Sequence, residues 1–481
     1  MSSYKLIGFL MAILFFIGCK KKNDAVNPEL SVSPSEINLP AEGGTADLTI
    51  NCNAQWSISN LALWLKFSKL SGNSGNNIIQ LTAMPNQTGA TRSIYLSVNS
   101  SNGQARRVKV SQPATIYPSY NTSPKAPDSI GMSTAVQLAA KFKLGWNIGN
   151  TMEAPNGETG WGNPQITESY IKFVKQQGFT AIRLPCAWNW THLSDEKTAK
   201  IDPAWLNRVK EIVGYCVNND MYVMLNIHWD GGWLENNISK LKQDSVSAKQ
   251  KALWEQIATA LRDFDEHLMF ASANEPNADD AAETAILTSH HQTFVNAVRS
   301  TGGKNSHRVL ILQGPNTSMS LTSQYMTTLP TDPAANRLMV EAHNYTPSLF
   351  CFFGEDQSWG RMIYYWGNGH HSTIEPDRNA TFGEENDIIS DYNKVKAAFV
   401  DKGIPVIMGE YGAYRRNNSN HVPLDLATHE ASVDYWITFT TKEALARGIK
   451  PFWWDTGGAL DRANNTVKDQ RTIDALLEGA K

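Results

Sequence analysis

The sequence predicts an α/β protein in which a TIM (β/α)8 barrel follows a small all-β, immunoglobulin-like sandwich. Three observations support this prediction. Eight short apolar runs alternate with amphipathic helical segments over residues 129–481, as the strands and helices of such a barrel do. Residues 30–114 instead contain short period-two runs between turn-forming residues, which is typical of a sandwich. At 481 residues, the chain is also too long for one ordinary domain.

Residues 1–19 are predicted to be a lipoprotein signal peptide. Lys5 precedes a 12-residue apolar run at 6–17, well short of the ~20 residues that span a bilayer. Residues 16–19 read Phe-Ile-Gly-Cys and resemble a bacterial lipobox, which implies that Cys19 becomes the lipid-modified first residue of an exported protein. We therefore expect attachment to the bacterial outer membrane, at the cell surface or the periplasmic face, through this lipid only. An ordinary secretory signal in which Cys19 is incidental is the alternative.

Composition excludes several kinds of partner. A net charge of -3 with 41% hydrophobic residues argues against a nucleic-acid partner or a polybasic membrane surface, so a neutral substrate fits better. The cysteines after Cys19 are scattered over both predicted domains without metal-ligand spacing, so neither a disulfide framework nor a metal site is expected. We expect a monomer that needs no cofactor.

Residues 30–114 predict a sandwich of roughly seven strands, with clear alternation at 46–50, 94–98 and 107–110. The order of Gly43-Gly44, Trp56, Trp64, Gly72 and Val-Ser-Gln at 110–112 resembles the BACON domain, an immunoglobulin-like module of exported Bacteroidetes glycoside hydrolases. Carbohydrate binding has been proposed for that family, but we interpret both tryptophans as core residues first. The Pro-containing segment 115–128 is predicted to be a semi-rigid linker.

The predicted barrel strands are apolar runs of the kind that is buried on both faces of a parallel sheet. They lie at residues 142–148, 181–185, 222–228, 268–273, 309–313, 338–343, 406–409 and 451–454. Helical periodicity between them is clearest at residues 205–217, 248–264, 284–298, 388–400 and 433–446. Active sites of such barrels lie at the carboxyl ends of the strands, so polar residues there are the candidates.

Two acids end predicted strands in the same manner. Glu275 follows strand 268–273, and Glu410 follows strand 406–409. The sequence offers no nucleophilic Ser or Cys with a His partner and no glycine-rich phosphate loop, so the two carboxylates remain as the reactive groups. Nine tryptophans lie at or beyond the strand ends, and we expect about half to pack in the barrel and the others to line a sugar cleft. They are Trp146, Trp161, Trp188, Trp190, Trp229, Trp233, Trp359, Trp366 and Trp453.

Five motifs together resemble glycoside hydrolase family 5. They are Ile-Arg-Leu-Pro at 182–185, Asn-Ile-His at 226–228, Asn-Glu-Pro at 274–276, His-Asn-Tyr at 343–345 and Gly-Glu-Tyr-Gly at 409–412. Residues 144–151 and 453–455 are also similar to the endoglucanase-rich subfamily 4. The resemblance extends from about residue 135 to the C-terminus.

This resemblance implies that Glu275 is the general acid/base and Glu410 the nucleophile, with Arg183 and Tyr345 orienting Glu410. A retaining glycosidase needs one carboxyl with a raised pKa and one that stays ionised, roughly 5–5.5 Å apart. We expect Arg183 to keep Glu410 charged, and the charge of Glu410 to raise the pKa of Glu275.

The remaining candidates are expected to bind the sugar or support the acids. Asn274 would hydrogen-bond the 2-hydroxyl of the reacting sugar, His343 would neighbour Glu275, and His228 and Trp454 would line subsite -1. Further candidates at the strand ends are Asn150 and Trp229.

Two positions depart from the family pattern. Trp229 replaces the usual second histidine after His228, which leaves the sugar preference open, and Ala271-Ser272 replace the Glu often found before Asn-Glu-Pro, which we interpret as a structural change. His290-His291 and His370-His371 are interpreted as surface or loop histidines.

The expected function is that of a retaining endo-β-1,4-glucanase that hydrolyses cellulose-like or mixed-linkage β-glucan without metal. The alternatives are a xyloglucanase or mannanase with the same catalytic residues, or, in a different class, a non-catalytic glycan-binding surface lipoprotein.

Overall fold

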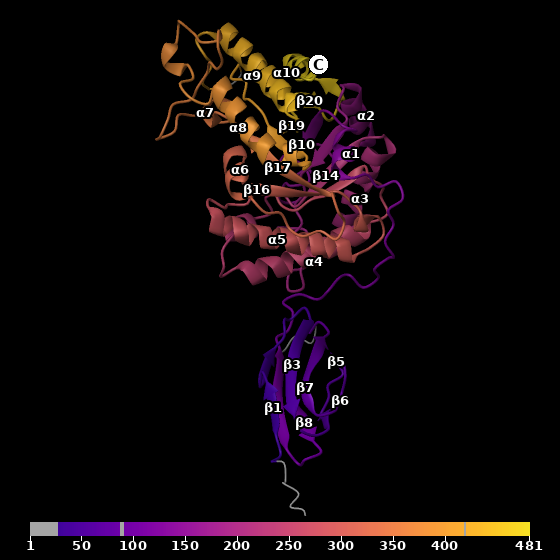
Figure 1. Cartoon of the computed structure of the whole chain (residues 1–481). Coiled ribbons are helices and arrows are strands. Elements are labelled where there is room, and N and C mark those ends of the chain that lie inside the picture. Colours follow the sequence, from indigo (N-terminus) through magenta and orange to yellow (C-terminus); the bar gives the residue numbers. More distant parts are fainter. Residues whose placement is uncertain (1–26, 87–90, 418–419) are drawn as a thin grey trace, which may run out of the picture. The chain divides into compact units, whose positions relative to one another are not determined.

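The computed structural model describes residues 27–86, 91–417 and 420–481 in two compact units that divide between Thr115 and Ile116 (Figure 1). The predicted signal peptide and Cys19 lie outside the described residues. Within the described ranges, no helix has both the length and the apolar character needed to cross a membrane.

The first unit is a sandwich of two β-sheets with strand orders β1-β3-β7-β5 and β2-β9-β8-β4-β6. Alternating burial along the long strands places Leu48, Ile79, Val98 and Val108 in one core between the sheets. The described strands are β1 (Leu30–Ser33), β2 (Glu36–Asn38), β3 (Gly44–Cys52), β4 (Trp56–Ser59), β5 (Leu65–Phe67), β6 (Ser71–Gly72), β7 (Gly75–Ala83), β8 (Arg92–Ser100) and β9 (Ala105–Gln112). These nine exceed the roughly seven predicted, because strands of two or three residues carry too little alternation to be recognised.

Both tryptophans of this unit belong to its core, as predicted. Trp56 is 2% exposed, and Gly72 lies so close that a Cβ there would come within 2.6 Å of the indole. Trp64 packs against the same core, and the Arg92 guanidinium lies 4.5 Å from the centre of its ring.

The second unit contains a closed barrel of eight parallel strands that follow one another in chain order. Its strands are β10 (Gly145–Ile148), β11 (Ala181–Leu184), β14 (Tyr222–Asn226), β15 (Leu268–Ala271), β16 (Leu310–Ser318), β17 (Leu338–Asn344), β18 (Val406–Tyr411) and β19 (Ile449–Asp455). All eight predicted strands are thus present. The register places Asn147 level with both Arg183 and Trp454, so polar side chains meet at the carboxyl ends.

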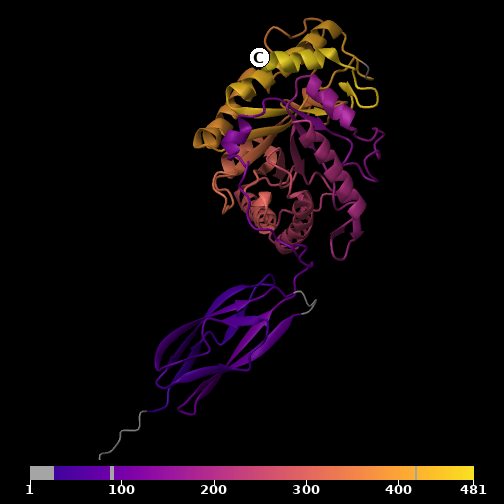
Figure 2. The same ribbon diagram turned by 90° about the vertical axis from the view of Figure 1, so that its right-hand side faces the viewer.

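Helices cover the outside of the barrel (Figure 2). They are α1 (Ala135–Ala139), α2 (Glu168–Gln176), α3 (Pro203–Asn218), α4 (Gln243–Leu261), α5 (Ala281–Ser300), α6 (Met319–Tyr325), α7 (Ser348–Cys351), α8 (Glu385–Ala398), α9 (Leu426–Ala446) and α10 (Gln470–Gly479). Short 3-10 turns η1 (Glu235–Asn237), η2 (Lys304–Ser306), η3 (Pro376–Arg378) and η4 (Val400–Lys402) and the small pairs β12 (Leu193–Asp195) with β13 (Lys200–Ile201) and β20 (Leu460–Asp461) with β21 (Thr466–Val467) complete the unit.

Part of the segment predicted to be a semi-rigid linker, residues 119–121, packs against the barrel unit. One oxygen of Glu255 in α4 accepts hydrogen bonds from Ser119 Oγ at 3.0 Å, Tyr120 N at 2.6 Å and Asn121 N at 3.2 Å. Asn121 Nδ2 also donates to the carbonyl of Ser300 at 2.8 Å. The proline content suggested a spacer, but composition alone does not reveal a buried carboxylate on another element that satisfies this backbone.

We therefore expect the two possible truncations of the first unit to differ. A chain that begins at Ile116 keeps the contacts to Glu255 and should melt like the barrel of the full chain. A chain that begins at Asp128 loses them, at about 1 kcal/mol for each hydrogen bond, and its Tm should fall by roughly 3 °C or more. Thermal unfolding of the two truncations checks this, and equal Tm values would contradict it.

Candidate active site

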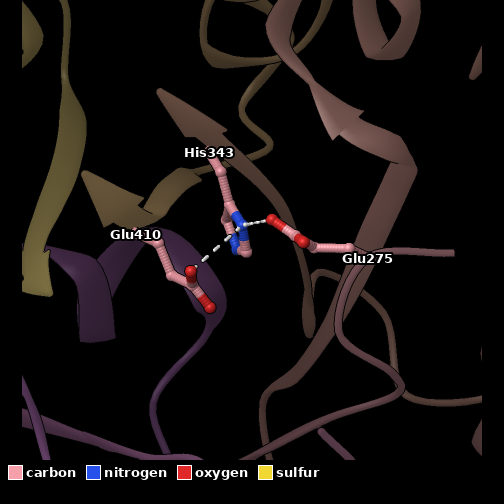
Figure 3. A group of neighbouring side chains, drawn as sticks. All are labelled: Glu275, His343 and Glu410. Carbon is pink, nitrogen blue, oxygen red and sulfur yellow. Dashed lines mark hydrogen bonds and ion pairs between the residues drawn. The ribbon is translucent and has the colours of Figure 1, made fainter. Parts of the chain in front are cut away.

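Glu275 and Glu410 lie at the carboxyl ends of β15 and β18, where they face each other across His343 of β17 (Figure 3). His343 Nδ1 is 2.7 Å from Glu275 Oε1 and 3.8 Å from Glu410 Oε2. One ligand atom from each of these three residues lies within 4.8 Å of the other two. The two carboxylates are therefore close enough to act on one sugar carbon and its glycosidic oxygen.

Glu410 is held from two sides. Arg183 Nη1 donates to its Oε1 at 2.8 Å, and the Tyr345 hydroxyl donates to its Oε2 at 3.1 Å. Arg183 is fully buried and also donates to Asn147 Oδ1 at 3.1 Å and to Asn274 Oδ1 at 2.7 Å. These bonds fix both oxygens of Glu410. Because the Asn274 oxygen is the atom that accepts from Arg183, the Asn274 amide nitrogen is not used in this contact.

Burial raises the pKa of Glu410, and the charges of Glu275 and Glu341 add to this effect, while His343 and Arg183 oppose it. Burial also raises the pKa of Tyr345, together with the charge of Glu410, so its phenol remains a hydrogen-bond donor. The resulting carboxylate is buried, hydrogen-bonded and paired with a cation.

The pKa of Glu275 differs from the prediction. Burial would raise it, but the side chain is 47% exposed, and the hydrogen bond and charge of His343 bring the pKa below its usual value. Burial would likewise lower the pKa of His343, but Glu410, Glu275 and Glu341 raise it to about 9. The prediction of a raised pKa for Glu275 is therefore wrong for the unliganded protein, because it included no cation beside this acid.

Glu341 is a buried acid of this site that the sequence analysis missed. It is 0% exposed and lies two residues before His343 on β17, so the period-two geometry of a strand places both side chains on one face. An acid at that spacing from a candidate histidine was the available signal. Its Oε1 is 3.0 Å from Arg183 Nε and 3.1 Å from His343 Nε2.

Glu275, His343 and Glu410 also form the one group of acids and histidine in the described part of the chain whose ligand atoms are close enough to share a metal ion. The Arg183 guanidinium, 2.8 Å from Glu410, already supplies positive charge at this position. A second cation would face it directly, so the group does not suit a metal.

The predicted sugar-binding residues separate into two groups. His228 is buried and stacks parallel to Trp454 at a centroid distance of 5.7 Å, and burial followed by the charges of Arg183 and His343 lowers its pKa, so it is neutral. Trp229 is 42% exposed and packs edge-on against Trp190 at 5.2 Å. Asn150 lies in the loop after β10, where its backbone N–H donates to Glu153. In the described ranges, neither Asn150 nor Trp229 hydrogen-bonds to Glu275 or Glu410.

A cavity of about 770 Å³ opens beside Tyr345, the residue that donates to Glu410. Its lining also includes Phe352, Tyr414, Arg415 and Trp454. Arg415 is fixed in place by ion pairs, among them one to Asp469 at 2.8 Å, so this wall is polar and firmly held.

About half of the nine tryptophans are barrel packing, as predicted. Trp146, Trp188, Trp366 and Trp453 are buried, whereas Trp161, Trp190, Trp229 and Trp359 are exposed. Aromatic rings thus remain available on the molecular surface for sugar stacking.

The interpretation of His290-His291 as surface or loop histidines is wrong. Both are 0% exposed, and His290 Nδ1 lies 3.0 Å from Ser247 Oγ of the neighbouring helix α4. His291 bridges Ser272 Oγ and the Gln313 carbonyl at 2.9 Å each, so the departure at Ala271-Ser272 is part of a buried polar network.

Both units of the chain match families of known proteins. Residues 146–459 match the family described as cellulase (glycosyl hydrolase family 5). The chain belongs to glycoside hydrolase family 5. Residues 29–115 match a family described as viral BACON domain, so the first unit is a BACON-type domain.

Three matches, one to a sequence and two to solved structures, illustrate the similarity. The chain is 31% identical to a xyloglucan-specific endo-β-1,4-glucanase of Bacteroides ovatus over 99% of this chain and 96% of that one. The structure of a Bacteroides ovatus GH5 xyloglucanase with a XXXG heptasaccharide has a TM-score of 0.69 and 30% identity, and covers 94% of this chain and 100% of its own. A GH5-4 broad specificity endoglucanase from Bacteroides salanitronis has a TM-score of 0.63 and 29% identity, covering 76% of this chain and 98% of its own.

Family membership and the short distance between the two acids both indicate a retaining mechanism. A carboxylate pair this close suits double displacement, whereas an inverting enzyme separates its acids by about 6.5–9.5 Å to admit a water molecule. The protein is therefore an enzyme of family 5, a retaining glycoside hydrolase that acts on a glycan.

Proposed function

We propose that this enzyme is an endo-β-1,4-glucanase whose preferred substrate is xyloglucan, a glucan backbone with pendant sugars. The observation that carries this proposal is the cavity beside Tyr345 and Trp454. At about 770 Å³ it lies within the ~300–1,000 Å³ range of pockets that hold multi-ring ligands, so it leaves room for a branch beside the backbone sugar. A relative that matches the chain along nearly its whole length is xyloglucan-specific, which supports this choice.

In the proposed mechanism, Glu410 attacks the anomeric carbon while Glu275 protonates the departing oxygen. Glu275 then removes a proton from the water that hydrolyses the glycosyl-enzyme, so the product keeps its configuration. Arg183 and Tyr345 hold Glu410, and Asn274 offers its amide to the 2-hydroxyl of the reacting sugar. His228 and Trp454 form the wall of this subsite.

Unbranched cellulose-like or mixed-linkage β-glucan is the second candidate, because one of the similar enzymes has broad specificity. No observation on the site favours mannan. A non-catalytic glycan-binding role disagrees with the assembled pair of acids and with membership of an enzyme family.

Replacement of Tyr414 with Ala tests the branch pocket. This ring lines the cavity, and its loss should lower kcat/KM on xyloglucan roughly fivefold, the equivalent of about 1 kcal/mol of aromatic contact. Activity on lichenan should change less than about twofold, since that glucan has no branch. Phe382→Ala is the matched control, because Phe382 is another exposed ring, at 50% exposure, and lies outside the cavity wall. Equal losses on both substrates, or a wild-type preference for lichenan or carboxymethylcellulose over xyloglucan, would contradict the proposal.

The roles of the two acids have their own test. In Glu275→Ala, an activated aryl cellobioside should still form the glycosyl-enzyme, because its leaving group needs little protonation, and added azide should then give a glycosyl azide of retained configuration. Glu410→Ala lacks the nucleophile and should lose several orders of magnitude of activity, with any azide product inverted. Product configuration by NMR separates the two. An inverted azide from Glu275→Ala would refute the assignment.

We further propose that the protein is exported and anchored through a lipid on Cys19. This rests on the predicted signal peptide and the lipobox-like residues 16–19. Cys19→Ala should leave an unprocessed signal or release the protein from the membrane fraction of its host, whereas Lys21→Ala, two residues beyond, should remain membrane-bound. A processed Cys19→Ala protein that still sediments with membranes would overturn this proposal.

A further inference from the structure

Glu341 is linked to both proposed catalytic acids through two neighbouring side chains, Arg183 and His343. It is fully buried in β17 and contacts the two cationic side chains that do touch them. Its Oε1 is 3.0 Å from Arg183 Nε, and Arg183 binds Glu410. The same oxygen is 3.1 Å from His343 Nε2, and the opposite ring nitrogen of His343 binds Glu275. One carboxylate oxygen thus joins both halves of the site.

Neighbouring residues bind the Glu341 carboxylate and leave space for it. Gln313 Nε2 donates to its Oε2 at 2.6 Å, and Gln313 Oε1 in turn accepts from the Ala273 N–H at 2.8 Å. Gly409, the residue before Glu410, leaves the space that Glu341 occupies, since a Cβ there would lie 1.9 Å from Glu341 Oε1. A side chain at 409 would displace Glu341.

We propose that Glu341 is a positioning residue that keeps the proton of His343 on Nε2, so that Nδ1 is the atom that exchanges a proton with Glu275. This inference rests on the proposed role of Glu275 as acid/base. An imidazole nitrogen that donates to a carboxylate must carry a hydrogen, and the other nitrogen is then free to gain or lose one. Of the two ring nitrogens, Nε2 faces Glu341 and Nδ1 faces Glu275.

One proton moves between His343 Nδ1 and Glu275 during the proposed cycle. At neutral pH, the pKa of about 9 leaves both nitrogens of His343 protonated, and the lowered pKa of Glu275 leaves that carboxyl ionised. When substrate excludes water from Glu275, the Nδ1 proton crosses the 2.7 Å hydrogen bond to Glu275 Oε1 and leaves a neutral imidazole with its hydrogen on Nε2. Glu275 then gives this proton to the glycosidic oxygen as the bond to the anomeric carbon breaks. In the second step, Glu275 takes a proton from water and can return it to Nδ1.

The charged and titratable groups around His343 favour this cycle. On its own element, Glu341 lies in β17 and Tyr345 directly follows that strand. The other groups are Glu275 after β15, Glu410 in β18, Arg183 in β11 and the neutral His228 after β14. Burial would raise the pKa of Glu341, but Arg183, His343 and Gln313 bring it below its usual value, so Glu341 remains an acceptor.

Glu341→Gln tests the proposal because it preserves the shape of the side chain and removes its charge. The His343 titration, followed by nitrogen chemical shifts, should move from about 9 to a value about one pH unit lower, because a raising charge is gone. The Nε2-protonated tautomer should no longer dominate above that midpoint. At neutral pH, kcat/KM on xyloglucan should fall about tenfold, whereas kcat/KM on an activated aryl cellobioside should fall less than about threefold, since its bond cleavage needs little acid.

Asp332→Asn is the matched control. It removes another carboxylate whose side chain is almost fully buried and paired with an arginine, Arg299, at 2.7 Å, away from the two acids. It should leave the His343 titration and the ratio of the two kcat/KM values unchanged.

Two results would overturn the proposal. The first is an unchanged His343 titration and tautomer in Glu341→Gln. The second is an equal loss of kcat/KM on both substrates, which would mean that Glu341 acts only through Arg183 on Glu410. Azide products from Glu275→Ala test the acid/base role separately. An inverted azide product from Glu275→Ala, together with a shifted His343 titration in Glu341→Gln, would refute the role of Glu275 and not the contact between Glu341 and His343.

Discussion

The Arg183 guanidinium is the interaction on which the active site depends. It is fully buried and faces Glu410, Glu341, Asn147 and Asn274, so it connects β11 with β10, β17, β18 and the residue that follows Ala273. A buried cation is tolerated only when opposite charges and hydrogen bonds surround it. The ion pairs that allow Arg183 inside the barrel are thus the same contacts that orient Glu410. Loss of any one partner would disturb both the interior and the site.

The same chemistry explains how two glutamates can take different proposed roles. Glu410 is enclosed and held by a permanent cation and a phenol, whereas Glu275 reaches solvent and is paired with a histidine, which can gain or lose its charge. A carboxyl beside a titratable partner suits proton transfer, and one beside an arginine suits nucleophilic attack. The difference lies in the neighbours and not in the acids themselves.

Chemistry and specificity are supplied by different parts of the barrel unit. The acids and their partners stand on or directly after strands, where the sheet restricts their movement. The lining of the cavity proposed to take a branch includes residues of connecting segments, among them Phe352 and Tyr414. This division allows related enzymes with one set of catalytic residues to differ in the glucans that they accept.

Some features of the protein follow from the sequence alone. Eight apolar runs, spaced by helical segments, predict the barrel because a doubly covered strand needs apolar residues on both faces. The motifs around Glu275 and Glu410 lie where each run ends, so their convergence at one end of the barrel also follows. The core position of Trp56 and Trp64 in the sandwich was also predicted from the sequence.

Other features were decided only by the tertiary structure. The partner of Glu275 is His343, from a strand two positions away around the barrel, and this contact reverses the predicted direction of its pKa. Glu341 gains its importance from Arg183 and Gly409, which are distant in the chain. The docking of residues 119–121 depends on Glu255 of α4. Local patterns determine which strand and face a side chain occupies, but the charge and hydrogen bonds of a buried group depend on neighbours that only the folded barrel brings together.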